Sequence, residues 1–145
     1  MHRLALLNGP NLDLLGQRDV TQYGSDTLES IEKNVSKLGL EKGIQVDCLQ
    51  SNHEGILIDA INGRLRPYSA IIINPGGLTH TSIALRDSLD AFPGIVVEVH
   101  ISNVHKREQF RHHSYISAIA DACIVGAGAF GYELALQFVV KKLGA

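Results

Sequence analysis

The stretch Ala70-Ile71-Ile72-Ile73-Asn74, followed by Pro-Gly-Gly, decides the fold class. Its continuous apolar run is typical of a strand that is buried on both faces of a sheet, and the residues after it predict a turn. We expect a helix over residues 81–91 and a second buried strand over residues 95–101, which carries Glu98 and His100. A strand, a helix and a strand in this order predict a βαβ unit, whose parallel strands are joined by a right-handed crossover.

The same alternation of strand-like and helix-like segments extends over the rest of the chain. Further strands are expected at residues 3–7, 45–50 and 122–125. Asp26 and Glu29 have the spacing of a capping box, which predicts a helix that begins near residue 28 and ends at Gly43. Two more helices are expected, at residues 57–65 and 132–143. Repeated units of this kind predict a parallel sheet with helices on both faces.

The composition is typical of one globular domain that covers residues 1–145. With a net charge of −2, 45% hydrophobic and 19% charged residues, the chain shows no sign of extensive disorder and no basic field for nucleic acid. No apolar run approaches the roughly 18 residues of a membrane span, and a strand begins at once without a targeting peptide, so we expect a cytoplasmic protein. Cys48 and Cys123 lie in separate apolar segments without metal-ligand spacing, and we interpret both as core residues.

Polar side chains follow three of the expected strands. Proteins of this class bind ligands beyond the carboxyl ends of their strands, so these loops are the predicted place for a site. The residues concerned are Asn8, Asn11, Arg18 and Tyr23, then Asn74, Thr79 and His80, then His100, Ser102, Asn103, Arg107 and Arg111. Strand ends are also where polar loops simply begin, and for any single residue that alternative stays open. Three such loops together favour a binding site.

Other chemistries have weaker support. Gly126, Gly128 and Gly131 match the dinucleotide fingerprint, but only 14 residues follow Gly131, too few for the strand and acidic residue that the fingerprint needs. A tight turn with close helix packing explains them better. The histidines, which include the adjacent pair at 112–113, have no HExxH or cysteine partner, so no metal is expected. The lysines lie on expected helix faces and loop tips, which disfavours a Schiff base.

The remaining candidates are suited to acid–base chemistry. An arginine near Tyr23, either Arg18 or Arg111, would favour the phenolate by lowering a pKa of about 10. The phenolate can then take a proton next to a carbonyl, while His100 donates one to a leaving hydroxyl. For Tyr23 taken alone, a ring packed in a loop is the simpler interpretation. The residues by themselves predict an enzyme that acts on a small polar anion without a cofactor, and they leave the reaction open.

Five stretches of the chain resemble the type II 3-dehydroquinate dehydratases. They are LNGPNL at 7–12, QSNHEG at 50–55, NPGGLTHTSIALRD at 74–87, EVHISNVH at 98–105 and REQFRHHS at 107–114. The resemblance covers essentially the whole chain and implies a flavodoxin-like three-layer α/β sandwich with a five-stranded parallel sheet. It also implies a hydro-lyase that converts 3-dehydroquinate to 3-dehydroshikimate, in the shikimate pathway or in quinate catabolism, with no metal or organic cofactor.

The resemblance also implies roles for individual residues. Tyr23 matches the base that removes a proton next to the ketone, and Arg18 matches the arginine that holds this tyrosine as a phenolate. Asn11 matches a residue that helps to hold a water at the enolate-like intermediate. His100 matches the general acid that assists loss of the C1 hydroxyl, and Glu98 matches a buried acid that orients His100.

Substrate-binding positions of the family fall on Asn74, His80, Ile101, Ser102 and Arg111. Asp87 matches a residue that reaches a neighbouring subunit's site, and the resemblance implies a homododecamer of four trimers. Family members commonly have a proline between the arginine and the tyrosine, whereas this chain has none, so we expect a more mobile lid over residues 17–22. The alternative from another class is a flavodoxin-like binding module without activity, which would need no acid–base pair.

Overall fold

Five parallel strands form one sheet in the structure, a computed structural model that describes residues 1–17, 21, 25–64 and 67–145. They are β1 (His2–Asn8), β2 (Ile44–Gln50), β3 (Ala70–Asn74), β4 (Ile95–His100) and β5 (Ala122–Val125). Their order is β2-β1-β3-β4-β5. This is the order of the flavodoxin-like doubly wound fold, so the predicted fold class is confirmed.

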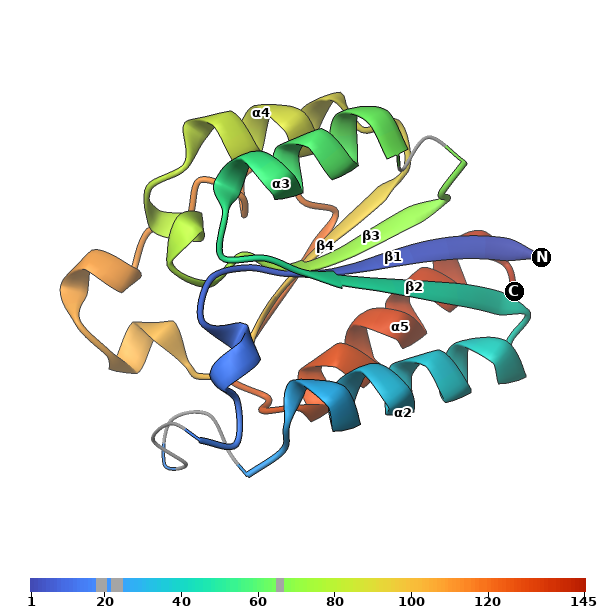
Figure 1. The fold of residues 1–145 in the computed structure, drawn as a ribbon, viewed down its shortest axis with the longest axis horizontal. Coiled ribbons are helices and arrows are strands. Elements are labelled where there is room, and N and C mark those ends of the chain that lie inside the picture. The colour runs from blue at the N-terminus through green and yellow to red at the C-terminus, as the bar shows by residue number, and fades with distance from the viewer. Residues whose placement is uncertain (18–20, 22–24, 65–66) are drawn as a thin grey trace.

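Helices of the described part of the chain cover both faces of the sheet, as Figure 1 shows. They are α2 (Leu28–Glu41), α3 (Glu54–Asp59), α4 (Ile83–Ala91) and α5 (Phe130–Leu143). Helices α3 and α4 lie on one face, and α2 and α5 lie on the other. In the described part of the chain, no helix is long and apolar enough to span a bilayer.

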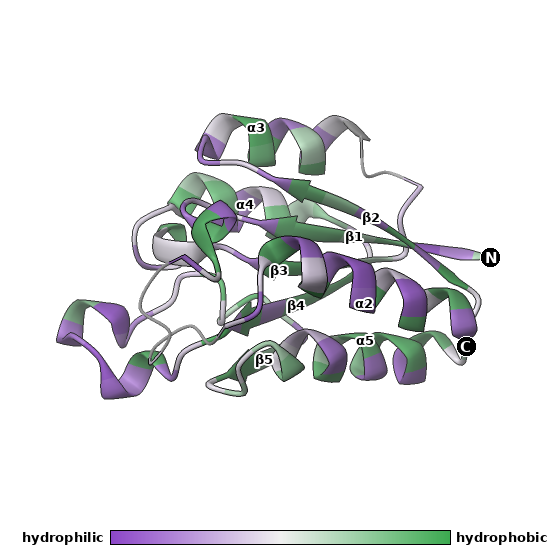
Figure 2. Ribbon diagram, turned by 60° about the horizontal axis from the view of Figure 1, so that its bottom comes forward, coloured by the Kyte–Doolittle hydropathy of each residue, from purple (hydrophilic) through white to green (hydrophobic). Residues whose placement is uncertain are grey.

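The alternation of side chains along each strand produces two separate apolar cores. Leu4 and Leu6 of β1 point to the layer of α2 and α5, whereas Ala5 and Leu7 point to the layer of α3 and α4. The central strands are therefore hydrophobic along most of their length, as the green ribbon of Figure 2 shows. Because both faces are covered, the polar residues of these strands are confined to their ends.

The first long helix begins with a capping box, but one residue later than predicted. Thr27, not Asp26, is the N-cap: its hydroxyl accepts from the Ser30 backbone N–H, and the Ser30 hydroxyl accepts from the Thr27 N–H. Asp26 and Thr27 are both residue types that can cap a helix, and only Thr27 does so here. The helix ends at Glu41, just before Gly43, whose φ of 73° any other residue would adopt with strain.

The next two helices also differ from the prediction at their boundaries. Helix α3 covers only residues 54–59 and continues as a π-helical turn over Ala60–Arg64, while Leu65 lies outside the described residues. Helix α4 begins at Ile83, because the Ser82 hydroxyl accepts from the Leu85 N–H and acts as N-cap. Shifts of one or two residues are common at helix ends.

The prediction that both cysteines are core residues is wrong. Cys48 and Cys123 are exposed, because β2 and β5 are the two edge strands and one side of each remains open. Partial burial still raises the pKa of each thiol to about 11. Neither thiol is a reactive thiolate at neutral pH.

Candidate active site

A cleft of about 190 Å³ lies where the carboxyl ends of β1, β3 and β4 meet. In this strand order the crossovers run in opposite directions from β1 and β3, which is where doubly wound proteins bind their ligands. The lining residues are Pro10, Asn11, Leu12, Asn74, Gly76, Gly77, His80, His100, Ile101, Ser102, Val104, Arg107 and Arg111. The fold thus brings together seven of the predicted site residues from three loops.

The charge of the cleft distinguishes it from larger hollows on the surface. Two hollows of about 540 and 520 Å³ have no arginine, lysine or histidine among their described lining residues. The cleft has two arginines and two histidines, and none of its described lining residues is acidic. A small anion is therefore attracted to this cleft more strongly than to either of these two hollows.

The loop after β1 is held in place from two sides. Asn11 has a left-handed φ of 71°, and its backbone N–H donates to the Asn52 Oδ1 at 2.9 Å. Gln50 also donates to this oxygen, so the end of β2 supports the loop. On the other side, a Cβ at Gly9 would lie 2.4 Å from the Pro75 oxygen, so only glycine permits this approach to the loop after β3.

Glu98 and His100 form a buried hydrogen-bonded pair at the end of β4. The His100 Nε2 lies 2.5 Å from the Glu98 Oε2, and both side chains are almost completely buried. Burial alone would raise the Glu98 pKa, but hydrogen bonds from His100, Cys123 and Ser117 lower it to about 2. Glu98 is therefore a carboxylate at neutral pH, and the Nε2 that faces it carries a proton.

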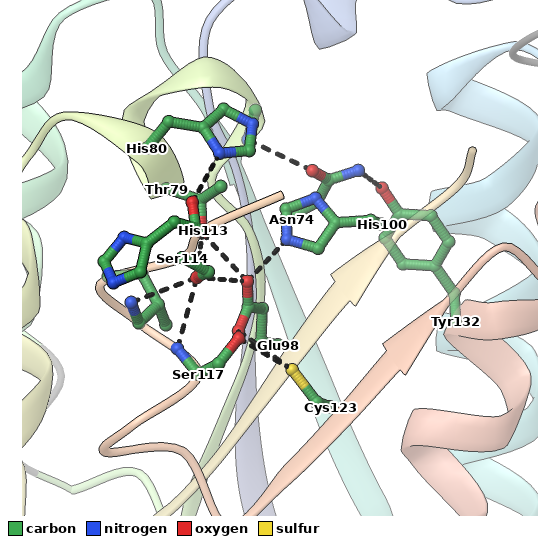
Figure 3. Close-up of polar contacts among 12 residues, drawn as sticks. Asn74, Thr79, His80, Glu98, His100, His113, Ser114, Ser117, Cys123 and Tyr132 are labelled. Atoms are coloured by element: carbon green, nitrogen blue, oxygen red, sulfur yellow. Dashed lines mark hydrogen bonds and ion pairs between the residues drawn. The ribbon is translucent and has the colours of Figure 1, made fainter. Parts of the chain in front are cut away.

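We call the residues around this carboxylate the carboxylate cluster; they are Glu98, His100, Thr79, Ser114, Ser117 and Cys123, shown in Figure 3. Thr79, Ser114 and His100 lie at 2.5–2.8 Å from Oε2, and Ser117 and Cys123 lie at 2.5 and 3.0 Å from Oε1. Donors from β4, β5 and two loops thus surround one buried charge. Such a set holds a carboxylate in one orientation.

His80 faces the same cleft from the loop after β3. Its Nδ1 lies 2.8 Å from the His113 carbonyl oxygen, so this nitrogen carries the proton. Burial lowers the pKa of His80, and the hydrogen bond to His113 opposes that shift. The neutral ring therefore has an Nε2 that can accept a hydrogen bond.

Two arginines complete the rim, on the segment that projects beyond β4 at the left of Figure 1. Arg107 donates to the Ser102 hydroxyl at 3.1 Å. Arg111 donates from Nε to Glu108 at 3.0 Å. Both arginines line the cleft, and a hydrogen bond to a neighbouring side chain, Ser102 or Glu108, fixes the position of each guanidinium.

Four predicted residues do not line the cleft in the described structure. Glu98 lies behind it, in contact with His100. Arg18 and Tyr23 lie outside the described residues, as does most of the predicted lid at 17–22. Asp87 is on α4, with a side chain that is 61% exposed and paired with Arg86 at 2.7 Å. It does not line the cleft of its own chain.

Sequence reasoning missed residues that hydrogen-bond to the site residues without lining the cleft themselves. Asn52, Ser114, Ser117 and Tyr132 were assigned no role, although Asn52 and Ser114 lie within the motifs that carry the family resemblance. Arg107 was recognised only as a polar residue after a strand. Among the residues that the structure describes, no three His, Cys, Asp or Glu side chains are grouped so that they could hold a metal ion.

Comparison with known proteins places the chain in a family. Residues 2–140 match the model of the family described as "Dehydroquinase class II". The 3-dehydroquinate dehydratase of Haemophilus influenzae is 51% identical over 142 residues, which cover 98% of this chain and 95% of that protein. The catabolic 3-dehydroquinase 2 of Neosartorya fischeri is 50% identical over 143 residues, which cover 99% of this chain and 95% of that protein.

A solved structure gives the same result. The type II dehydroquinase of Propionibacterium acnes superposes with a TM-score of 0.92 at 36% identity, over 97% of each chain. The structure from Butyrivibrio crossotus, also a type II dehydroquinase, superposes with a TM-score of 0.92 at 40% identity, over 95% of this chain and 97% of that one. From its sequence and its fold alike, this chain belongs to the type II dehydroquinase family.

Proposed function

We propose that the chain dehydrates 3-dehydroquinate to 3-dehydroshikimate by an acid–base elimination in the cleft. The observation that carries this proposal is the buried Glu98–His100 pair beside a cationic cleft. The substrate offers a carboxylate that a cationic cleft attracts, hydroxyls for hydrogen bonds with the rim, and a ketone that acidifies the neighbouring C–H bond. The relatives named above are enzymes of this reaction by name.

His100 is the proposed general acid, and the geometry decides which nitrogen acts. Its Nε2 is occupied by Glu98, so the proton for the departing C1 hydroxyl comes from Nδ1. Nδ1 carries a proton only in the imidazolium form. The hydrogen bonds around Glu98 keep this carboxylate ionised, so Nε2 stays bound to it and Nδ1 is the nitrogen left for the substrate.

Tyr23 is the proposed base, with Arg18 as the cation that favours its phenolate. The phenolate takes the proton next to the ketone, which gives an enolate; collapse of the enolate expels the C1 hydroxyl as water with the proton from His100. Asn11 lines the cleft and is proposed to hold the water that stabilises the enolate. Tyr23 gains one proton and His100 loses one, and exchange with solvent restores both.

The substrate is held by the remaining residues of the rim. Arg111 is proposed to bind a substrate hydroxyl, and Ile101 and Ser102 to bind the carboxylate. His80 accepts a hydrogen bond from a second hydroxyl through its free Nε2, because its Nδ1 is bound to His113. The side-chain amide of Asn74, which lines the cleft, is proposed to donate one hydrogen bond to the substrate and to accept another. This arrangement needs no cofactor.

A spectrophotometric assay with 3-dehydroquinate, without added metal or nucleotide, tests the function. We expect the ultraviolet absorbance of the conjugated product to appear, and we expect turnover to survive borohydride, because each of the six lysines is exposed and no Schiff base is involved. Tyr23→Phe is expected to abolish turnover without unfolding. No turnover by the folded chain would favour the binding-module alternative.

The assembly is a further part of the proposal. The exposed Asp87 on α4 is proposed to reach the site of a neighbouring subunit in a homododecamer. Light scattering gives the oligomeric state. Asp87→Ala is expected to reduce both assembly and turnover, and a fully active monomer would exclude a shared site.

The proposed pathway is the shikimate pathway, with quinate catabolism as the alternative. One relative is named as catabolic and another is not, and the chemistry is identical in both cases. Induction of the chain by quinate would identify the catabolic role; constant expression and a need for aromatic amino acids after deletion would identify the biosynthetic one. Cytoplasmic location stays a prediction, which fractionation of expressing cells would check.

A further inference from the structure

We infer that Tyr132 is a positioning residue: it fixes the amide of Asn74 in the orientation in which this side chain meets the substrate. The inference rests on the proposed function of the cleft. Tyr132 lies on α5, behind the sheet ends, and is 0% exposed. Figure 3 shows its hydroxyl beside the amide of Asn74. We call Asn8, Asn74 and Tyr132 the amide cluster.

The protons of this cluster can be assigned from one fixed donor. The backbone N–H of Gly76 can only donate, and it lies 3.1 Å from the Asn74 Oδ1. The Asn74 Nδ2 is therefore the atom that faces Tyr132, and it donates to the hydroxyl at 3.0 Å. The hydroxyl has a single proton, which it gives to the Asn8 Oδ1 at 2.6 Å.

The hydrogen bond from Gly76 and the hydrogen bond to Tyr132 require the same orientation of the Asn74 amide. If the Asn74 amide flipped, its NH2 would face the Gly76 N–H and two donors would meet. Burial also raises the pKa of Tyr132, so the hydroxyl keeps its proton at every working pH. The second N–H and the second lone pair of Asn74 then remain for a ligand in the cleft, with their directions fixed.

The glycine motif before α5 explains how a tyrosine reaches this position. A Cβ at Gly126 would lie 2.9 Å from the Asn103 Cβ, and Gly126 has a φ of 87°. A Cβ at Gly131 would lie 3.4 Å from side-chain atoms of Ile124 and Val99, which is ordinary van der Waals contact, so glycine is required in the turn and not in the helix. The motif that resembles a nucleotide fingerprint thus forms the turn from β5 into α5, whose first turn carries Tyr132 to the ends of β1 and β3.

The test is a comparison of Tyr132→Phe with wild type in the dehydration assay. In the proposed reaction, Asn74 contacts the bound substrate and the transition state equally. If its amide loses its orientation, binding of both is weakened by the same amount. We expect KM to rise about tenfold, with kcat changed by less than about threefold. Asn74→Ala should raise KM by at least as much, and the double variant should be no worse than Asn74→Ala alone, because Tyr132 acts through Asn74.

Tyr68→Phe is the matched control. It also removes a phenol hydroxyl that bonds to two side chains, Arg3 and Asp47, but Tyr68 lies away from the cleft. Its KM should stay at the wild-type value. An equal KM shift in both tyrosine variants, or additive effects of Tyr132→Phe and Asn74→Ala, would overturn the inference.

Two further measurements keep the outcome decisive. Asn8→Ala removes the acceptor of the tyrosine proton without touching Asn74; it should also raise KM, and it replaces Tyr132→Phe if that variant does not fold. Calorimetric binding of quinate, a related hydroxylated carboxylate, gives the same comparison without turnover. A wild type that binds but does not react would contradict the proposed function alone, whereas an unchanged quinate Kd in Tyr132→Phe and Asn8→Ala would contradict the role of Tyr132.

Discussion

The carboxylate cluster and the amide cluster stand side by side behind one cleft and differ in charge. The carboxylate cluster surrounds an ionised Glu98 with donors, and it binds the His100 ring at Nε2. The amide cluster is neutral and links Asn8, Tyr132 and Asn74 through one direction of proton donation. The comparison teaches that two buried polar networks at the ends of neighbouring strands can serve separate purposes. One keeps Glu98 ionised, and the other fixes the orientation of the Asn74 amide.

The largest expected effect is on the rate, through the carboxylate cluster. His100→Ala removes the proposed acid and should lower kcat by about 100- to 10,000-fold, the usual contribution of a general acid. His105→Ala is the control, because this exposed histidine does not line the cleft. Steady-state kinetics at pH 7 compares the two. Equal rates in both variants would remove His100 from the mechanism.

Glu98→Gln should give the next largest effect, on stability. The Glu98 pKa is lowered to about 2 in the folded chain, so the carboxylate stabilises the fold by about 3 kcal/mol at neutral pH. This stabilisation is complete above pH about 4.5, the usual pKa of glutamate, and is lost as the pH falls to about 2.

Urea unfolding of Glu98→Gln and wild type at pH 7 and pH 3 measures this difference. The stability gap between the two proteins should narrow at the lower pH. Glu41→Gln, at an exposed helix end, is the control and should give the same small change at both pH values. A gap that does not depend on pH would mean that Glu98 stabilises by packing and not by its charge.

Ser117→Ala sharpens the comparison between the clusters. It removes a donor to Glu98 at 2.5 Å and should cost about 1.5–3 kcal/mol, as for other hydrogen bonds to charged groups. It should also raise the Glu98 pKa and move acid unfolding to higher pH. Tyr132→Phe, in the neutral cluster, should lower the free energy of unfolding by the same amount at pH 7 and pH 3. A loss of stability that depends on pH in both variants would show that the clusters are not separate.

The smallest expected effect lies outside both clusters. Ser82→Ala removes the N-cap of α4 and should lower the free energy of unfolding by about 0.5–2 kcal/mol. Its KM and kcat should stay at wild-type values, because Ser82 contacts neither cluster nor cleft. Thermal unfolding with parallel kinetics checks both parts, and a kinetic effect would mean that α4 is coupled to the site.

The parts of the fold that depend on local pattern were predictable. The bounds of β3 and β5 agree with the predicted ones, because continuous apolar runs next to turn residues leave little choice. The start of α2 at residue 28 was predicted, but its N-cap was off by one residue, since Asp26/Glu29 and Thr27/Ser30 are both capable capping pairs. Cys48 and Cys123 were misplaced because a strand's position at the sheet edge does not follow from its own residues.

The site was predictable where a family motif carries it and not where distant residues support it. Predicted residues of the loops after β3 and β4 line one cleft. Tyr132 was missed because its partners Asn74 and Asn8 are 58 and 124 positions away in sequence. Only the assembled sheet, with α5 packed on it, brings these three residues together. The glycines before Tyr132 also resembled a different motif, the dinucleotide fingerprint.

The measurement that tests the division between the clusters most directly is a steady-state comparison of kcat and KM for wild type, Glu98→Gln and Tyr132→Phe. Glu98→Gln should lower kcat, because the carboxylate that accepts from the His100 Nε2 is lost and no longer holds the proposed acid in place. Tyr132→Phe should leave kcat almost unchanged and raise KM. An equal fall of kcat in both variants, or an unchanged kcat in Glu98→Gln, would contradict the account.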